Sequence, residues 1–197
     1  MCAIELASAR LRLRPPAPSD LDALAALSAD PEVMEHYPAP LSRAESEAVL
    51  QRIRAHFETH GYGMWVMTPA GALAAEAASD TLLGICGLQH ATFTLAQPPP
   101  IEIGWRLARR WWGRGLVTEA ATAALDFAFR RLALPEVVAC TVPDNRRSRA
   151  VMTRLGMQHV EDGDFEHVRI PEGHRLRRHV LYRLERLRWQ RGRGALP

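Results

Sequence analysis

The segment from Glu102 to Ala120 constrains this chain most, because it reads as a strand, a short basic turn and the start of a helix. The turn spans residues 110–115 and has the letters RWWGRG. Its glycines, Gly113 and Gly115, let the backbone approach a ligand without interference from a Cβ atom. The amides and the positive dipole end of the following helix favour an anion at the same place. The segment therefore predicts a cradle for phosphate.

Two other phosphate-binding loops fit this segment less well. A P-loop requires a lysine, and the chain contains none. A dinucleotide-binding loop requires a third glycine where Thr118 stands, and an acidic residue at the end of the next strand, whereas Glu136 precedes that strand. The alternative that stays open is an ordinary strand-to-helix turn that binds nothing.

The size and composition indicate one globular domain. The chain has 197 residues, of which 47% are hydrophobic and 24% charged, and such a composition excludes a disordered chain. No apolar run approaches the ~18 residues that a membrane helix requires, and the first residues lack the apolar stretch of a secretory signal. We expect a cytoplasmic protein with a single domain over residues 1–188 and a tail over residues 189–197.

The cysteines and histidines do not suggest a metal or a disulfide. Cys2, Cys86 and Cys140 are isolated and odd in number, so we expect reduced thiols. The histidines form no His-Glu-x-x-His pattern, and His174 and His179, five residues apart, would lie on different faces of a helix. We therefore predict no metal.

The basic residues are all arginine, and one cluster of them stands near the end of the chain. Such a cluster is compatible with binding to RNA or to another acidic surface. The net charge is only +3, however, and acidic residues are interleaved along most of the sequence. We expect a solvated edge and a frayed tail instead. The cluster comprises Arg175, Arg177, Arg178, Arg183, Arg186, Arg188, Arg191 and Arg193.

Hydrophobic periodicity predicts strands and helices in the order βααβββαβαββ, which is an α/β (α+β) fold with a mixed sheet. Helices are expected over residues 19–27, 42–57, 116–132 and 145–155. The second of them opens with the capping box of Ser42 and Glu45. Strands are expected over residues 11–14, 62–67, 82–90, 101–107, 137–142, 158–165 and 179–187. The Ala-rich segment 69–80 reads as a long, mobile loop.

This order of elements resembles the RimJ/RimL-like branch of the GNAT superfamily of N-acetyltransferases. The turn is similar to the Q/R-x-x-G-x-G/A signature for acyl-coenzyme A in that superfamily, and the resemblance runs from about Leu11 to Arg188. It implies the GNAT fold, in which helices flank a mixed central sheet whose central strands splay apart. Further stretches that carry it are 11–14, 30–34, 84–88, 102–105, 145–148 and 155–157.

The resemblance also implies where acetyl-CoA would bind. Main chain of the central strand would pair with the coenzyme arm, and amides of the turn would hold the pyrophosphate beside two arginines. Asn145 would hydrogen-bond the arm, although an asparagine there is equally suited to be a plain helix N-cap. The residues implied are Trp105, Leu107, Arg110, Trp112, Gly113, Arg114, Gly115 and Asn145.

Transfer of an acyl group to an amine needs a base for the amine proton and a donor for the leaving thiolate. Glu102 is the first candidate base, because a carboxylate on an apolar strand is costly unless it faces a cleft or is paired. A purely structural pair is the alternative. Ser148, one turn after Asn145, is the candidate donor to the coenzyme sulfur. Many GNAT members instead use a tyrosine seven residues after the asparagine, and Met152 stands at that position here. A glutamate that other members use is replaced by Cys140.

The acceptor implied by the resemblance is a primary amine, on a protein N-terminus or a small molecule, attacked directly in a ternary complex. An α-amine of pKa ~8 is ~10% neutral at pH 7, whereas a lysine amine of pKa ~10.4 is neutral at under ~0.1%. No metal, membrane or nucleic-acid partner is expected, and a homodimer is compatible. The rival reading is a non-catalytic coenzyme A-binding or RNA-binding module, for which affinity for nucleic acid would fall steeply with salt.

Overall fold

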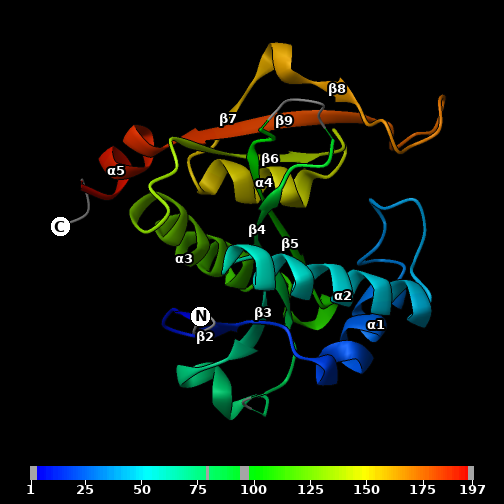
Figure 1. Ribbon diagram of the computed structural model, residues 1–197, viewed down its shortest axis with the longest axis vertical. Coiled ribbons are helices and arrows are strands. Elements are labelled where there is room, and N and C mark those ends of the chain that lie inside the picture. Colours follow the sequence, from blue (N-terminus) through cyan, green and yellow to red (C-terminus); the bar gives the residue numbers. More distant parts are fainter. Residues whose placement is uncertain (1–3, 79, 94–97, 195–197) are drawn as a thin grey trace. The chain divides into compact units, whose positions relative to one another are not determined.

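The computed structural model describes residues 4–78, 80–93 and 98–194. These residues form a mixed α/β fold with one open mixed sheet flanked by helices, as the sequence predicts (Figure 1). The strand order is β1-β2-β3-β4-β5-β6-β9-β7, and β8 pairs with β9. The chain divides into two compact units, residues 1–89 with 104–124 and residues 90–103 with 125–197. We call them unit 1 and unit 2.

Unit 1 holds an antiparallel group of strands: β1 (Leu6–Ala7), β2 (Leu11–Arg14), β3 (Met64–Pro69) and β4 (Gly84–His90), paired in that order. The predicted alternation in β2 is confirmed, because Leu11 and Leu13 are fully buried whereas Arg12 is exposed. A Cβ atom on Gly84 would lie 2.2 Å from the carbonyl oxygen of Arg106. Only glycine therefore permits this approach of β4 to β5 (Ile101–Leu107).

The two long helices of unit 1 are α1 (Leu21–Ala29) and α2 (Arg43–His60). The predicted capping box of α2 is confirmed, since Ser42 Oγ accepts from the amide of Glu45 and the Glu45 carboxylate accepts from the amide of Ser42. The last helical residue, His60, lies three residues beyond the expected end at Phe57, and Gly61 caps α2 in the left-handed region at φ 74°. The helix gains this last turn because the amide of Gly61 donates to the carbonyl of Phe57.

Residues 19–20 do not begin α1 as predicted, because they belong to a short 3-10 turn, η1 (Pro18–Asp20). The carboxylate of Asp20 accepts from the guanidinium of Arg14 at 2.6 and 2.8 Å and from the amide of Ala17 at 2.7 Å. These bonds hold the turn closed, so α1 starts only at Leu21.

The segment 69–80 is more ordered than expected. Residues Gly71–Ala75 form a 3-10 turn, η2, and Leu73 within it is 2% exposed. The amide of Ala70 also donates to the carbonyl of Arg10. The prediction of a loose loop is wrong here because a single buried leucine anchors the Ala-rich segment; residue 79 lies outside the described residues.

Unit 2 is built on β9 (Arg178–Glu185), which pairs antiparallel with β6 (Glu136–Thr141), and Figure 1 shows β9, in orange, running alongside β6. The first part of β5 is parallel to β6, with Glu102 opposite Val138. The predicted strand 158–165 is interrupted by a 3-10 turn, η4 (Glu161–Gly163). Its two ends are β7 (Gln158–His159) and β8 (Phe165–Glu166), and both pair with β9.

Helices complete unit 2. Two of them, α4 (Arg146–Arg154) and α5 (Arg186–Gly194), belong wholly to unit 2. The helix α3 (Leu116–Arg130) starts in unit 1, and its residues from 125 on belong to unit 2. The segment from residue 189 on, expected as a frayed tail, is helical to Gly194 because Trp189 is only 9% exposed and its indole N–H donates to Asp126 at 3.1 Å.

Two sequence-based expectations concern cysteines and membranes. Cys86 is buried, which raises the pKa of its thiol, and Cys140 is half-buried; Cys2 lies outside the described residues. Within the described ranges, no helix combines the length and the apolar character needed to cross a bilayer.

Candidate functional site

The predicted anion-binding turn lies in unit 1, between β5 and α3. It opens with a 3-10 turn, η3 (Arg109–Trp111), and then passes through Gly113 at φ 74° and Gly115 at φ 75°. Both angles lie in the left-handed region, which glycine adopts at little cost. A Cβ atom on Gly113 would meet nothing within 4 Å, so this side of the turn is open.

Backbone amides of the turn point to anion binding. Among the described residues, the amides of Gly113, Arg114 and Gly115 have no hydrogen-bond acceptor. The carbonyl of Gly115 accepts from the amide of Glu119, so α3 begins directly after Gly115 and leaves its first amides at the same end. The amide of Trp112, which is also predicted to hold the pyrophosphate, donates to the carbonyl of Arg109 at 3.0 Å.

A set of hydrogen bonds that the sequence did not reveal connects the turn to the segment before β2, and we call it the clamp of Glu119. Glu119, in the first turn of α3, accepts from the amide of Arg10 at 2.8 Å, from its Nε at 2.7 Å and from Ser8 Oγ at 2.7 Å. Arg10 Nη1 donates onward to the carbonyl of Arg114 at 3.1 Å. Burial of Glu119 opposes its ionisation, but the hydrogen bonds from Ser8 and Arg10 outweigh it and lower the pKa of the carboxyl.

The two arginines of the turn differ in their partners. Both guanidinium carbons lie 5.2 Å from the centroid of the Trp111 ring. Arg114 also forms a bidentate ion pair with Glu76, with N–O distances of 2.7 and 2.9 Å, and its hydrogen bonds lower the pKa of the Glu76 carboxyl. Arg110 is exposed and has no ion pair with any residue that the structure describes. It is therefore the more available cation.

The end of β5 carries Trp105 and Leu107, whose main chain is predicted to pair with the coenzyme arm. The carbonyl of Leu107 accepts from the indole N–H of Trp112 at 2.7 Å. A carbonyl oxygen has a second lone pair, so a further bond from a ligand is not prevented. Trp105 is half-buried on the same strand.

The candidate base belongs to unit 2. Glu102 Oε1 accepts a hydrogen bond from the thiol of Cys140 at 3.4 Å. Burial raises the pKa of Cys140 well above its usual value, and the charge of Glu102 adds to this effect, so the thiol stays protonated and acts as the donor. Val138, which faces Glu102 in the ladder, and Cys140 lie on one face of β6 because side chains alternate along a strand. No pattern in the sequence indicates that Glu102 and Cys140 form a pair.

Asn145 is the N-cap of α4, as one of the two predicted roles requires. Its Oδ1 accepts from the amide of Ser148 at 3.1 Å, and its Nδ2 donates to Thr141 Oγ1 at 2.9 Å. Ser148 is half-buried in the first turn of the helix. Met152, at the position of the family tyrosine, is 2% exposed and is part of the core.

In unit 2, two phenylalanine rings and two imidazoles contact one another, with Phe165 on β8 and His179 on β9. We call Phe93, Phe165, His167 and His179 the aromatic–histidine cluster. Phe165 stacks on Phe93 at 4.6 Å and on His179 at 5.5 Å between ring centroids, and His167 lies 5.0 Å from His179.

His179 of the aromatic–histidine cluster shares a sheet face with the residue that contacts the candidate base. Leu181 lies opposite Cys140 in the antiparallel ladder, and His179 is two residues from Leu181. Paired residues and alternate residues point to the same side of a sheet. His179, Leu181 and Cys140 therefore share one face in unit 2, and Glu102 reaches Cys140 there.

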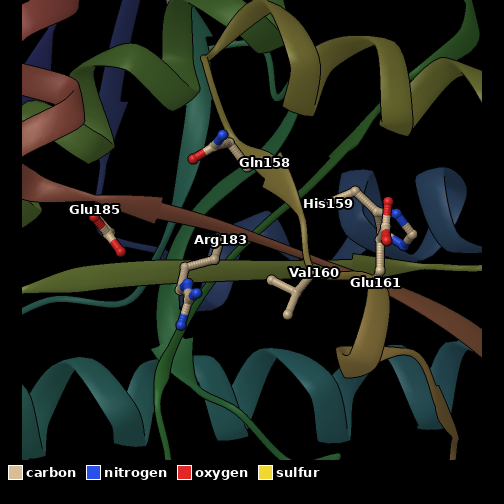
Figure 2. Close-up of a pocket in the computed structure, with 6 residues that line it drawn as sticks. All are labelled: Gln158, His159, Val160, Glu161, Arg183 and Glu185. Carbon is tan, nitrogen blue, oxygen red and sulfur yellow. The ribbon is translucent and has the colours of Figure 1, made fainter.

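A separate pocket of about 360 Å³ lies at β7 and β9 in unit 2. Figure 2 shows its lining of Gln158, His159, Val160, Glu161, Arg183 and Glu185. Arg183 is paired with Glu136 at 3.8 Å, and two carboxylates line the pocket. It is a poor site for a polyphosphate, and none of the predicted site residues lines it.

Much of the arginine cluster near the chain end is bound within the fold. Arg177 and Arg178 pair with Glu166 and Asp164 at 3.1 and 3.3 Å. The side chains of Arg186 and Arg188 donate to the carbonyls of Ala133 and Gly156. These partners leave fewer cations for nucleic-acid phosphates, which weakens the RNA-binding alternative.

Comparisons with known proteins show the family of this chain. A sequence model described as the acetyltransferase (GNAT) domain matches residues 10–158. The [ribosomal protein uS5]-alanine N-acetyltransferase of Escherichia coli is 32% identical over 91 residues, which are 46% of this chain and 45% of that protein. The match thus spans less than half of that relative.

Solved structures extend the likeness over nearly the whole chain. An acetyltransferase from Agrobacterium tumefaciens has a TM-score of 0.73 and 26% identity, and the match covers 94% of this chain and 96% of the other. RimJ from Mycobacterium smegmatis, in complex with CoA-disulfide, has a TM-score of 0.70 and 18% identity over 98% of this chain and 96% of its own. At that identity, the likeness to RimJ shows the fold alone.

Proposed function

Because the chain belongs to the GNAT family of acetyltransferases, we propose that it transfers an acetyl group from acetyl-CoA to a primary amine by direct attack in a ternary complex. The observation that carries the proposal is the turn of unit 1, where two glycines with positive φ precede the start of α3. The E. coli relative is named for acetylation of an alanine, and RimJ was solved with a coenzyme A disulfide.

The residues of the turn fit the diphosphate of acetyl-CoA. The amides of Gly113, Arg114 and Gly115 have no acceptor among the described residues, the side of Gly113 is open, and Arg110 supplies a cation. A helix start adds a favourable dipole for the anion. Acetyl-CoA, when bound, supplies an acetyl group activated as a thioester.

Glu102 is proposed to take the proton of the attacking amine. The thiol of Cys140 donates to Oε1 of this carboxylate at 3.4 Å, and a carboxylate within hydrogen-bond reach of the amine is able to act as its general base. The amine nitrogen forms the new C–N bond as the C–S bond breaks. Ser148 is proposed to protonate the departing sulfur and to regain its proton from solvent. Asn145 positions Ser148 by capping its backbone amide.

The acceptor is proposed to lie along the sheet face that Glu102 shares with Cys140 and Leu181, with the aromatic–histidine cluster as an apolar wall beside it. An α-amine has a larger neutral fraction at pH 7 than a lysine side chain, so a single carboxylate base suits it better. We therefore place N-terminal α-amines and small-molecule α-amines ahead of lysine.

A thiol-release assay tests this function. Acetyl-CoA is incubated with an N-terminal alanine peptide, an N-blocked lysine peptide and a panel of small amines. We expect release with an α-amine and a loss of kcat of about 10²–10⁴ in Glu102→Gln. Glu185→Gln, on an exposed residue of β9, is the matched control and should retain activity. Full activity of Glu102→Gln would contradict the assignment of the base.

A further inference from the structure

Two histidines stand one turn apart at the C-terminal end of α2. His56 is half-buried and His60 is exposed. Their ring centroids lie 4.4 Å apart, and a ring nitrogen of one lies within 4.8 Å of a ring nitrogen of the other. Residues four apart project from the same face of a helix, so the spacing brings two nitrogen donors to one point.

Tyr62 orients the first of these rings. Nδ1 of His56 lies 2.8 Å from the carbonyl oxygen of Tyr62. A carbonyl oxygen only accepts, so Nδ1 carries the hydrogen and Nε2 carries the lone pair. Imidazoles that bind metals commonly donate their other N–H to a carbonyl in this way, which fixes the tautomer and the ring orientation. The ring of His56 is thus held as a ligand would be.

The surroundings favour a cation over an anion. Both histidines lie in the last two turns of α2, where the helix dipole places partial negative charge, and Gly61 ends the helix directly after His60. Imidazole nitrogens prefer Zn²⁺, Ni²⁺ or Cu²⁺ to Mg²⁺ or Ca²⁺. Burial raises the pKa of the Cys86 and Cys140 thiols, so these are not ready thiolate ligands that would compete.

We propose that His56 and His60 form a binding site for a divalent transition metal ion of the zinc class at the C-terminal end of α2, with solvent completing the coordination. The site uses none of the residues assigned to acyl transfer. Bound metal ties two successive turns of α2 together, so it stabilises the folded chain over the unfolded one. The sequence search missed it because it asked for a His-Glu-x-x-His pattern, whereas the residues here are HFETH.

Calorimetric titration of ZnCl₂ into the chelator-treated full chain tests the proposal. We expect one equivalent to bind to the wild type. Loss of an outer-shell partner of a metal ligand costs about 10–100-fold in affinity, so His60→Gln, which loses a ligand, should bind zinc at least about tenfold more weakly. MgCl₂ should not bind there. Zinc should raise the Tm of the wild type and not that of His60→Gln, and circular dichroism serves as the control that this variant is folded.

Two further variants sharpen the result. His56→Gln should lose zinc to the same degree as His60→Gln. His159→Gln removes an exposed histidine whose Nε2 lies 2.8 Å from a carboxylate oxygen of Asp164, and it should bind zinc as the wild type does. Equal zinc affinity in the wild type and His60→Gln, or no binding by the wild type, would overturn the proposal.

Discussion

Arg10 and Glu119 are 109 positions apart in the chain and are joined by three contacts. The backbone amide of Arg10 donates to Oε1 of Glu119 at 2.8 Å, its Nε donates to Oε2 at 2.7 Å, and its Nη2 lies 2.7 Å from Oε2. Arg10 also reaches the carbonyl of Arg114. The hydrogen bonds of Arg10 therefore connect three segments: the residues before β2, the glycine turn and the first turn of α3. The shape of the turn depends on a residue far from it in sequence.

Glu119→Gln should destabilise the fold and weaken acetyl-CoA binding together. The variant loses the charge that accepts from Arg10 and Ser8, and hydrogen bonds to charged groups contribute about 1.5–3 kcal/mol each. We expect a loss of about 1–3 kcal/mol in the free energy of unfolding, measured with urea. Glu5→Gln breaks the exposed pair with Arg12, at 2.8 Å, and should cost less than about 1 kcal/mol. Equal losses in both variants would show that the clamp has no special role.

Glu76→Gln should tighten the binding of acetyl-CoA. Its carboxylate holds Arg114 in an ion pair and competes with phosphate for that guanidinium. Removal of the carboxylate also removes a negative charge beside the turn, so we expect an affinity gain of about 2–5-fold, within the range of one exposed ion pair. Titration at low and high salt checks this, because the gain should shrink as salt screens the charges. Weaker binding by the variant would mean that the pair supports the turn.

Cys140→Ala should move the acid limb of the pH dependence of kcat/KM to higher pH. A carboxylate that loses a hydrogen-bond donor holds its proton more readily, and the Cys140 thiol donates to Glu102. Cys140→Ser keeps a donor and should move the limb much less. An unchanged limb in Cys140→Ala would indicate that Glu102 is not the titrating base.

Stability should fall as pH is lowered from about 7 to 5. Burial lowers the pKa of both His167 and His179. For His167, the charges of His179 and Arg169 lower the pKa further. For His179, the carbonyl of Arg177 and the charge of Glu166 oppose the effect of burial. Over this pH range the folded chain therefore binds fewer protons than the unfolded chain. The two histidines contribute to the free energy of unfolding above their unfolded pKa, and this contribution is lost as the pH falls below it. Urea unfolding of wild type and His179→Gln across this range checks it, and equal slopes would contradict it.

The sequence predicted what depends on local patterns. The strand 101–107, the capping box of Ser42 and Glu45, and the glycine turn all rest on residues close in the chain, and the structure has each of them. The family follows from the same stretches, taken in order. These features could be predicted because the backbone conformation that they need is set by neighbouring residue types.

Tertiary partners escaped the sequence. The bond of Cys140 to Glu102, the clamp of Glu119 and the occupation of Arg114 by Glu76 each join residues at least 38 positions apart. No periodicity records which carboxylate meets which donor. A tertiary contact also explains the segment from residue 189 on, expected to be a tail. It is helical to Gly194 because the indole of Trp189 is buried.

The most direct test of the account is calorimetric titration of acetyl-CoA into the wild type, Gly113→Asp and Gly173→Asp. Gly113 and Gly173 have φ angles of 74° and 76° with nothing within 4 Å of an added Cβ, so the backbone strain is matched at about 1 kcal/mol. Only Gly113→Asp places a carboxylate in the proposed cradle. The account predicts binding by the wild type and Gly173→Asp and its loss in a folded Gly113→Asp. Equal binding by all three, or none by the wild type, would contradict it.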